Sequence, residues 1–234
     1  MPTLSILIPA YNEERTIGEV LSALVQLRLP EGWDKEIIVV NDRSHDGTAA
    51  VVLAFVATNP ASAVVLIEQE MNRGKGAAIH RGIAAATGDW LIVQDADLEL
   101  DPAEINKVLQ PVLLGHADIV YGNRFAQGLP YAGYPMRSYR ANRFLTWLSN
   151  RTTGLGLGDM EVCYKLMPTA VAKGLRLREQ RFGFEPEVTA RLAKVKALRW
   201  AQVPIRYSAR THDEGKKIGW KDGLRAVWCI VRNV

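Results

Sequence analysis

Three acidic residues, Asp95, Asp97 and Glu99, occupy every second position shortly after the apolar run Trp90–Val93. Carboxylates one residue apart at a strand end can bind a hard divalent cation from one side of an extended turn, with water and diphosphate oxygens as the other ligands. A D-x-D pattern alone is weak evidence, because about half a match is expected by chance among 11 aspartates in 234 residues. The preceding strand and the third carboxylate nevertheless favour a cation site.

Three earlier segments carry groups that suit a nucleotide or its phosphates. Asp42, assisted by Ser44, can accept hydrogen bonds from a base or ribose, although both also suit the cap of the following helix. Glu13 can act similarly, or it can belong to the acidic first turn of a helix. Lys75 lies between two glycines at a predicted helix start, where backbone N–H groups and an ammonium favour an anion.

Arginines are the candidate phosphate ligands later in the chain. Arg124 follows another predicted strand and can meet a phosphate. Arg137, Arg140 and Arg143 lie at helical spacing, so that they form either a phosphate-binding face or a solvated helix face.

Two late acidic segments are candidates for contact with a sugar or an acceptor. Asp159 suits that role, but it also suits the stabilisation of a turn after a glycine-rich stretch. Glu185 can serve chemistry, yet it lies with Glu187 in the first turn of a predicted helix, where negative charge is favourable in any case.

Several protein classes are excluded by missing patterns. The four histidines show no H-x-x-x-H pairing and no G-x-S-x-G segment is present, which removes zinc and serine hydrolase interpretations. The segment around Lys75 lacks the upstream glycine and following Ser/Thr of an ATPase loop. The two distant cysteines argue against a disulfide framework. Nucleic acid is not an expected partner, because no recognition-helix, zinc-finger or RNP-like pattern occurs.

Short apolar runs alternate with helical patterns through most of the chain, which predicts an α/β fold with a mainly parallel sheet flanked by helices. The carboxyl ends of parallel strands share one edge, so the motifs described above should meet in one crevice. The expected strands are Leu4–Ile8, Glu36–Val40, Ala63–Ile67, Trp90–Val93, Asp118–Tyr121 and Cys163–Met167, and the expected helices are Thr16–Leu27, Asp46–Ala57, Gly76–Ala86, Pro102–Leu113, Arg137–Thr152 and Pro186–Lys194. A mobile loop is expected over Gln127–Pro135.

Charge divides the chain unevenly. Residues 1–134 hold 9 Lys and Arg against 17 Asp and Glu, whereas residues 135–234 hold 20 against 8, giving net charges of −8 and +12. A basic half suits phosphates or an anionic membrane surface, and equally a solvated surface. No signal-peptide pattern or apolar stretch of roughly 20 residues occurs. We therefore expect a cytoplasmic chain that associates peripherally with the cytoplasmic face of a membrane, and membrane helices beyond Val234 are left open.

Taken together, the motifs resemble inverting family 2 glycosyltransferases of the GT-A fold, and among them the dolichol-phosphate mannose synthase-like polyprenyl-phosphate glycosyltransferases. The likeness covers nearly the whole chain. It rests on Ile8-Pro9-Ala10-Tyr11-Asn12-Glu13, Asn41-Asp42-Arg43-Ser44-His45-Asp46-Gly47-Thr48, Gly74-Lys75-Gly76, Gln94-Asp95-Ala96-Asp97-Leu98-Glu99, Gly122-Asn123-Arg124 and Phe182-Gly183-Phe184-Glu185-Pro186-Glu187.

The resemblance implies a set of site residues. It places a nucleotide-sugar pocket at Pro9, Tyr11, Glu13, Asp42, Ser44, Lys75, Asp95 and Ala96, a Mg²⁺ or Mn²⁺ ion at Asp97 and Glu99 with Asp95 beside them, and phosphate contacts at Arg124, Arg137, Arg206 and Lys217. Asp97, Arg124, Asp159 and Glu185 are then the catalytic candidates. Glu99 departs from the glutamine that is frequent at this position in the mannose synthases. The implied organisation is one GT-A domain over residues 1–205, with a nucleotide-sugar half at 1–125 and an acceptor half at 126–205, and a basic amphipathic extension at 206–234.

The expected reaction is transfer of a hexose from a GDP-mannose or UDP-glucose type of donor to a dolichyl or undecaprenyl phosphate, with inversion. An acceptor phosphate with a second pKa of about 6 is largely ionised at neutral pH and needs no strong base. The alternative is transfer to a hydroxyl of a glycan or small molecule, with Asp159 or Glu185 as the base. A sugar-nucleotide pyrophosphorylase and a non-catalytic sugar-nucleotide binding module are weaker alternatives. A pyrophosphorylase should have a glycine-rich loop after the first strand, but Pro9–Glu13 occupies that position here.

Overall fold

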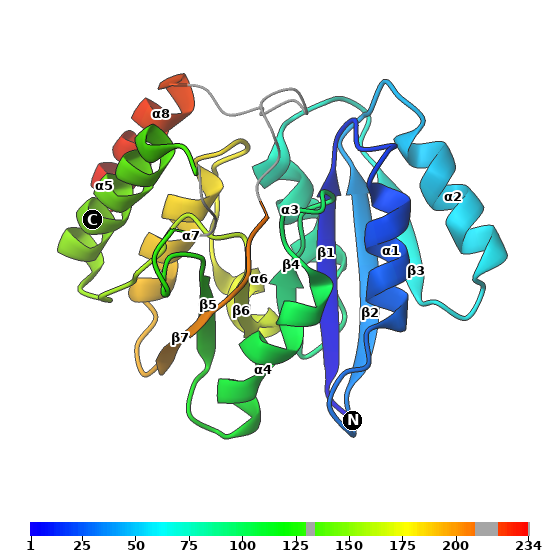
Figure 1. Ribbon diagram of the computed structural model, residues 1–234, viewed down its shortest axis with the longest axis horizontal. Coiled ribbons are helices and arrows are strands. Elements are labelled where there is room, and N and C mark those ends of the chain that lie inside the picture. Colours follow the sequence, from blue (N-terminus) through cyan, green and yellow to red (C-terminus); the bar gives the residue numbers. More distant parts are fainter. Residues whose placement is uncertain (130–133, 209–219, 234) are drawn as a thin grey trace.

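The computed structural model describes residues 1–129, 134–208 and 220–233 of the chain. These residues form a layered α/β fold in which one sheet is flanked by helices (Figure 1). Lys217 and part of the loop expected over Gln127–Pro135 lie outside the described residues. The strands are β1 (Thr3–Ala10), β2 (Asp34–Asn41), β3 (Val64–Glu68), β4 (Trp90–Val93), β5 (Ile119–Asn123), β6 (Lys165–Pro168) and β7 (Trp200–Pro204).

The sheet confirms the predicted mainly parallel arrangement. Its strand order is β3-β2-β1-β4-β6-β5-β7, and only β6 runs antiparallel to its neighbours β4 and β5. In β1 and β2 the apolar residues form nearly continuous runs, because helices cover both faces of these strands. In the central register Ile6 pairs with Ile37 on one side and with Ile92 on the other.

The helices surround this sheet, and every element expected from the sequence is present within two residues of its expected ends. The short helix α6, the edge strand β7 and the last helix α8 were not expected. No described helix is both long and apolar enough to cross a membrane. The helices are α1 (Ile17–Gln26), α2 (Thr48–Thr58), α3 (Lys75–Ala85), the 3₁₀ turn η1 (Pro102–Glu104), α4 (Ile105–Leu113), α5 (Met136–Thr153), α6 (Thr169–Gly174), α7 (Phe184–Ala193) and α8 (Trp220–Arg232).

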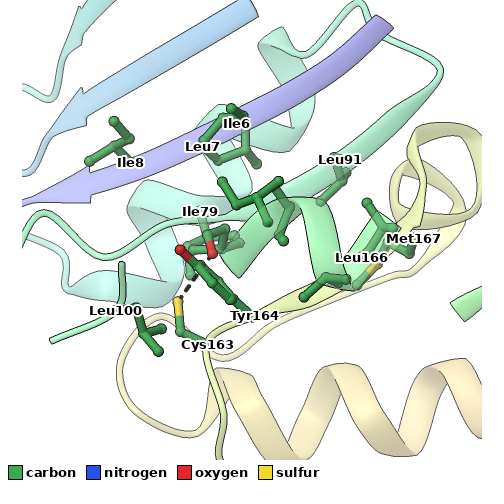
Figure 2. Packing of buried hydrophobic residues seen from close by; sticks show 14 of the residues in the cluster. Ile6, Leu7, Ile8, Ile79, Leu91, Leu100, Cys163, Tyr164, Leu166 and Met167 are labelled. Atoms are coloured by element: carbon green, nitrogen blue, oxygen red, sulfur yellow. Dashed lines mark hydrogen bonds between the residues drawn. The ribbon is translucent and has the colours of Figure 1, made fainter. Parts of the chain in front are cut away.

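One apolar core joins the parallel strands to the antiparallel strand β6. Ile6 and Leu7 of β1, Leu91 of β4, Leu166 of β6 and Ile79 of α3 are 0–1% exposed and belong to the same buried cluster (Figure 2). Since this core is continuous, the ends of β1, β4 and β6 are held at fixed positions relative to one another.

A close approach of two backbones fixes the start of α3. Ala77 N donates to Gln180 O at 2.9 Å, and a Cβ atom added to Gly76 would lie 2.3 Å from Glu179 O. We therefore expect Gly76→Ala to lower the free energy of unfolding by about 1–3 kcal/mol through overpacking, measured by urea denaturation. The matched control is Gly174→Ala, where no atom lies within 4 Å. Equal stability of the two variants would contradict this packing role.

Candidate active site

The carboxyl ends of β1, β2, β4 and β5 open into one pocket of about 560 Å³. The segments before β6, at the start of α7 and within α5 and α8 supply the opposite walls. The polar and aromatic side chains that line the pocket are Tyr11, Glu13, Asp42, Asn72, Lys75, Asp95, Asp97, Glu99, Arg124, Tyr134, Ser138, Asn142, Glu161, Cys163, Arg181, Phe182, Phe184, Glu185 and Tyr207.

Hydrogen bonds between two loops hold the ends of β1 and β2 together. Asn12 and Arg43 both have left-handed backbone conformations, with φ values of 53° and 59°. Asn12 N donates to Ser44 Oγ at 2.9 Å, and Glu13 N donates to Thr48 Oγ1 at 2.8 Å. Ser44 was expected in the nucleotide-sugar pocket, but it joins the two loops and does not itself line the pocket.

Asp42 ties the end of β2 to the glycine-containing turn before α3. Its carboxylate accepts hydrogen bonds from Gly74 N at 2.7 Å, from Arg73 N at 2.8 Å and from Gln69 Nε2 at 2.7 Å. Gly74 adopts φ of 98°, a conformation that strongly favours glycine. Asp42 lines the pocket as expected and is only 2% exposed, so it also shapes the turn that presents Lys75.

Lys75 and Asp95 form an ion pair on the pocket floor. Lys75 Nζ lies 2.7 Å from Asp95 Oδ1, 3.8 Å from Glu185 Oε1 and 3.8 Å from Cys163 Sγ. Burial alone would raise the pKa of Asp95, but the charge and hydrogen bond of Lys75 outweigh burial and hold that pKa below its ordinary value. Burial raises the pKa of the Cys163 thiol, with the charge of Asp95 adding to it, so this side chain stays neutral. Lys75 therefore brings one positive charge to the acidic end of the pocket.

Asp97 and Glu99 offer oxygen atoms to the same pocket. Glu99 N donates to Asp97 Oδ1 at 3.0 Å, and Tyr207 Oη donates to Glu99 Oε2 at 2.7 Å. Among the described residues, no three His, Cys, Asp or Glu side chains are grouped closely enough to bind a metal by themselves. Two carboxylates beside a pocket wide enough for a diphosphate nevertheless match the donor chemistry of Mg²⁺ or Mn²⁺, which commonly completes its shell with water and phosphate oxygens.

Arg124 is held over the pocket by a buried partner. Its Nε lies 2.6 Å from Asp159 Oδ2 and its Nη2 lies 2.9 Å from Asp159 Oδ1. Asn142 donates to the same carboxylate at 3.1 Å, and the ring centroid of Tyr207 lies 5.1 Å from the guanidinium carbon. Burial opposes the charge of Asp159, but the ion pair outweighs it and lowers the pKa of Asp159. Asp159 is fully buried and does not line the pocket, so it positions Arg124.

Glu185 and Glu187 begin α7 and have separate roles. Glu185 lines the pocket, and Lys165, which is 2% exposed, donates to its carboxylate. Glu187 accepts from Arg178 N at 2.8 Å and Glu179 N at 2.7 Å. Glu187 therefore fixes the turn that carries residues 178–182 to the pocket, and only Glu185 faces that pocket.

The structure gathers most of the residues singled out from the sequence. Arg137 and Arg206 are exposed and do not line the pocket. The remaining expected residues that do line it are Pro9, Tyr11, Glu13, Asp42, Lys75, Asp95, Ala96, Asp97, Glu99, Arg124 and Glu185. Sequence reasoning missed the pocket residues Asn142, Glu161 and Arg181. Glu161 lies two residues after Asp159, and its position in that acidic segment is the signal that could have found it.

The fold is similar to that of a solved sugar-transferring enzyme. The glucosyl-3-phosphoglycerate synthase of Mycobacterium tuberculosis, solved with Mn²⁺, UDP and phosphoglyceric acid, superposes with a TM-score of 0.73 at 20% identity, covering 99% of this chain and 78% of that one. The same enzyme solved with Mg²⁺ and UDP gives a TM-score of 0.71 at 21% identity, covering 99% and 79%. At these identities the likeness shows the fold, and it confirms the predicted GT-A class.

Sequence comparison identifies the family. Residues 5–174 match the model of glycosyl transferase family 2, and the chain belongs to that family. It is 30% identical over 213 residues to the undecaprenyl-phosphate 4-deoxy-4-formamido-L-arabinose transferase of Edwardsiella ictaluri (strain 93-146), covering 91% of this chain and 62% of that protein. The enzyme of the same name from Pseudomonas aeruginosa (strain LESB58) is 28% identical over 214 residues, covering 91% and 60%. The chain thus spans about three fifths of the length of these relatives, and the predicted resemblance is confirmed.

Proposed function

We propose that the chain transfers a sugar from a nucleotide diphosphate sugar to a polyprenyl phosphate, with inversion at the anomeric carbon. The observation that carries the proposal is the single pocket in which Lys75, Asp97, Glu99 and Arg124 meet. The names of the relatives support the acceptor class, since they act on undecaprenyl phosphate. Those names also suggest a pentose derivative as the sugar, beside the hexose expected from the sequence. We propose GDP or UDP as the nucleotide of the donor.

The donor is expected to lie along the carboxyl ends of β1, β2 and β4. Tyr11, Glu13 and Asp42 line that part of the pocket and would contact the nucleoside. Asp97 and Glu99 would hold a Mg²⁺ or Mn²⁺ ion, which supplies positive charge to the leaving diphosphate. Lys75 and Arg124 add fixed positive charge, and both are held by carboxylate partners before any substrate binds. Such preorganised charge favours the transition state in which the diphosphate departs.

The acceptor phosphate attacks the anomeric carbon through one of its oxygen lone pairs, and the bond from that carbon to the diphosphate breaks. A phosphate is already ionised near neutral pH, so no side chain has to remove a proton. Among the pocket carboxylates, Asp95 is paired with Lys75, and Glu185 is paired with Lys165. Asp159, the other base considered for a hydroxyl acceptor, is buried beneath Arg124. These partners argue against Asp95, Glu185 and Asp159 as the base that a hydroxyl acceptor would require.

Donor binding gives a direct test of the first half of this function. Thermal unfolding is measured with GDP-mannose, UDP-glucose and a UDP-linked pentose, each with Mg²⁺ or Mn²⁺ and again with a chelator. A donor present at 100 times its Kd should stabilise the chain by about 2.7 kcal/mol, and the chelator should remove most of the shift. The absence of any shift across the whole panel would contradict the proposal.

A surface formed by α5 and α8 supports contact with an anionic membrane. On α5, Arg140, Phe144, Trp147 and Arg151 are exposed at positions that share one helix face. On α8, Leu224, Trp228 and Val231 share a face and are 62%, 43% and 59% exposed, while Ala226, Cys229 and Ile230 on the other side are buried. The rings of Phe144 and Trp147 are stacked at 6.0 Å, and Arg225 and Arg232 both lie over the ring of Trp228. We refer to these residues as the α5–α8 surface.

The composition of the α5–α8 surface matches a membrane interface. Tryptophan suits the headgroup region, and each arginine near an anionic bilayer contributes about 1 kcal/mol of binding. Figure 1 places α5 and α8 at one end of the molecule and α1 and α2 at the other. We propose that this surface rests on the membrane that holds the polyprenyl phosphate.

Removing two arginines from this surface should weaken vesicle binding. We expect Arg140→Gln combined with Arg151→Gln to lower binding to phosphatidylglycerol-containing vesicles by about tenfold or more, measured by cosedimentation at low salt. The control is Arg28→Gln, an exposed arginine that follows α1 and is not part of the α5–α8 surface. Equal loss in the control, or wild-type binding that does not depend on anionic lipid, would contradict this orientation.

A further inference from the structure

Glu161 is a pocket residue that has no part in the proposed sugar transfer. It precedes β6, lines the pocket and is only partly buried as a residue. Its Oε1 atom, however, is inaccessible to solvent and receives no hydrogen bond from the described residues. Buried carboxylate oxygens are normally hydrogen-bonded, so an oxygen without a donor in a substrate pocket calls for a ligand or a proton.

The charged groups around Glu161 are already matched to other partners. Arg124 binds Asp159 through two hydrogen bonds, and Lys165 donates to Glu185. Burial, followed by the negative charge of Glu185, raises the pKa of Glu161 to about 7, although Lys165 and Arg124 act in the opposite direction. The carboxyl group is therefore partly neutral at physiological pH, in a pocket whose other acidic groups are paired or near the expected cation.

A neutral carboxyl group has an O–H donor and a carbonyl acceptor, and a sugar hydroxyl offers the same two functions in return. A phosphate is a poorer match at this position, because Asp159 and Glu185 offset the positive charges of Arg124 and Lys165 there. Lys75 and Arg124 line the pocket near the strand ends, and the phosphates are expected to bind there. The chemistry around Glu161 thus fits an uncharged polyhydroxyl group.

We propose that the neutral Glu161 carboxyl binds a hydroxyl group of the transferred sugar and helps to determine which sugar the pocket accepts. This inference rests on the proposed function, since it assigns the sugar end of the same pocket. Glu161 is assigned no proton transfer in the reaction. Glu161 therefore contacts the sugar, which is the group that distinguishes the donor from the free nucleotide diphosphate.

Comparing a nucleotide sugar with its nucleotide isolates this contact. Calorimetry gives Kd for UDP-glucose and UDP, and for GDP-mannose and GDP, in the presence of Mg²⁺. For the base that binds, we expect Glu161→Ala to raise the ratio of the nucleotide-sugar Kd to the nucleotide Kd by about five- to tenfold, the effect of one lost hydrogen bond. Glu70→Ala, which removes an exposed glutamate outside the pocket, should leave the ratio unchanged.

A second variant separates hydrogen bonding from packing. Glu161→Gln keeps one donor and one acceptor in the same shape but cannot titrate, so its ratio should stay within about twofold of the wild-type ratio at pH 6. In the wild-type chain the ratio should rise as the pH increases through about 7, because the neutral form is lost. In Glu161→Gln it should not change with pH.

The outcomes are distinct. An unchanged ratio in Glu161→Ala, or a ratio in the wild-type chain that is independent of pH from 6 to 8, would overturn the inference. Equal weakening of nucleotide and nucleotide-sugar binding would assign Glu161 a packing role and would also overturn it. Failure of the wild-type chain to bind any nucleotide sugar would contradict the proposed function itself and therefore also the inference about Glu161.

Discussion

Replacing Asp97 with Asn should lower kcat/KM for sugar transfer by about a hundred- to thousandfold. The amide keeps the shape of the side chain and can still accept the hydrogen bond from Glu99 N, which measures 3.0 Å, but it removes the negative charge expected to bind the cation. A metal ion that stabilises the leaving diphosphate contributes several kcal/mol, and each factor of ten corresponds to about 1.4 kcal/mol. Steady-state kinetics at varied Mg²⁺ or Mn²⁺ concentration measures both the loss and the change in metal requirement.

The control for this substitution lies in the same loop. Asp101 accepts a hydrogen bond from Ala103 N at 2.9 Å and does not line the pocket. Asp101→Asn should therefore retain activity within about threefold, since an amide oxygen can form the same cap. Full activity of Asp97→Asn at the wild-type metal concentration would show that the metal role assigned to Asp97 is wrong.

The second large effect is expected at Arg124. Arg124→Ala should lower kcat by about a hundredfold or more, because a preorganised cation is lost from the phosphate end of the pocket. The same change leaves Asp159 buried without its partner, which typically costs about 3–5 kcal/mol of stability. A loss of activity in this variant alone therefore combines two causes.

The double variant Arg124→Ala with Asp159→Asn separates those causes. Removing both charges should recover much of the free energy of unfolding, measured with urea, while the activity stays low. Asp159→Asn alone should reduce activity less than Arg124→Ala does, since the arginine remains and loses only its fixed orientation. Recovery of activity in the double variant would contradict a direct role for Arg124.

The sequence was sufficient to predict the regular part of the fold. The apolar runs of β1 to β4 agree with the final structure, and the parallel arrangement follows from the βαβ alternation. Two of the three elements that were not expected have weak local signals. Strand β7 is a short edge strand that ends in Pro204, and α6 has six residues. The position of β7 depends on pairing with β5, and that of α6 depends on packing against α3 and β6, which no local pattern records.

The candidate site was predictable as a set of residues and less so as a network. Strand-end motifs identified the acidic segment, Asp42 and Arg124, because parallel strands bring their carboxyl ends together. The ion pair of Lys75 with Asp95 joins residues from two separate strand ends, and it depends on burial that the sequence does not show. The same reason explains why Asp159 was expected to meet substrate, whereas its carboxylate is enclosed beneath Arg124.

A competition between acceptors tests the central claim most directly. The purified chain is incubated with the donor identified by thermal shift, a divalent metal, and equal amounts of undecaprenyl phosphate, undecaprenol and a soluble sugar, and all products are measured by mass spectrometry. The proposed function predicts one lipid product, undecaprenyl phosphate carrying one added sugar, with release of the nucleotide diphosphate. Glycosylation of the free hydroxyl acceptors without any phosphate-linked lipid product would contradict it.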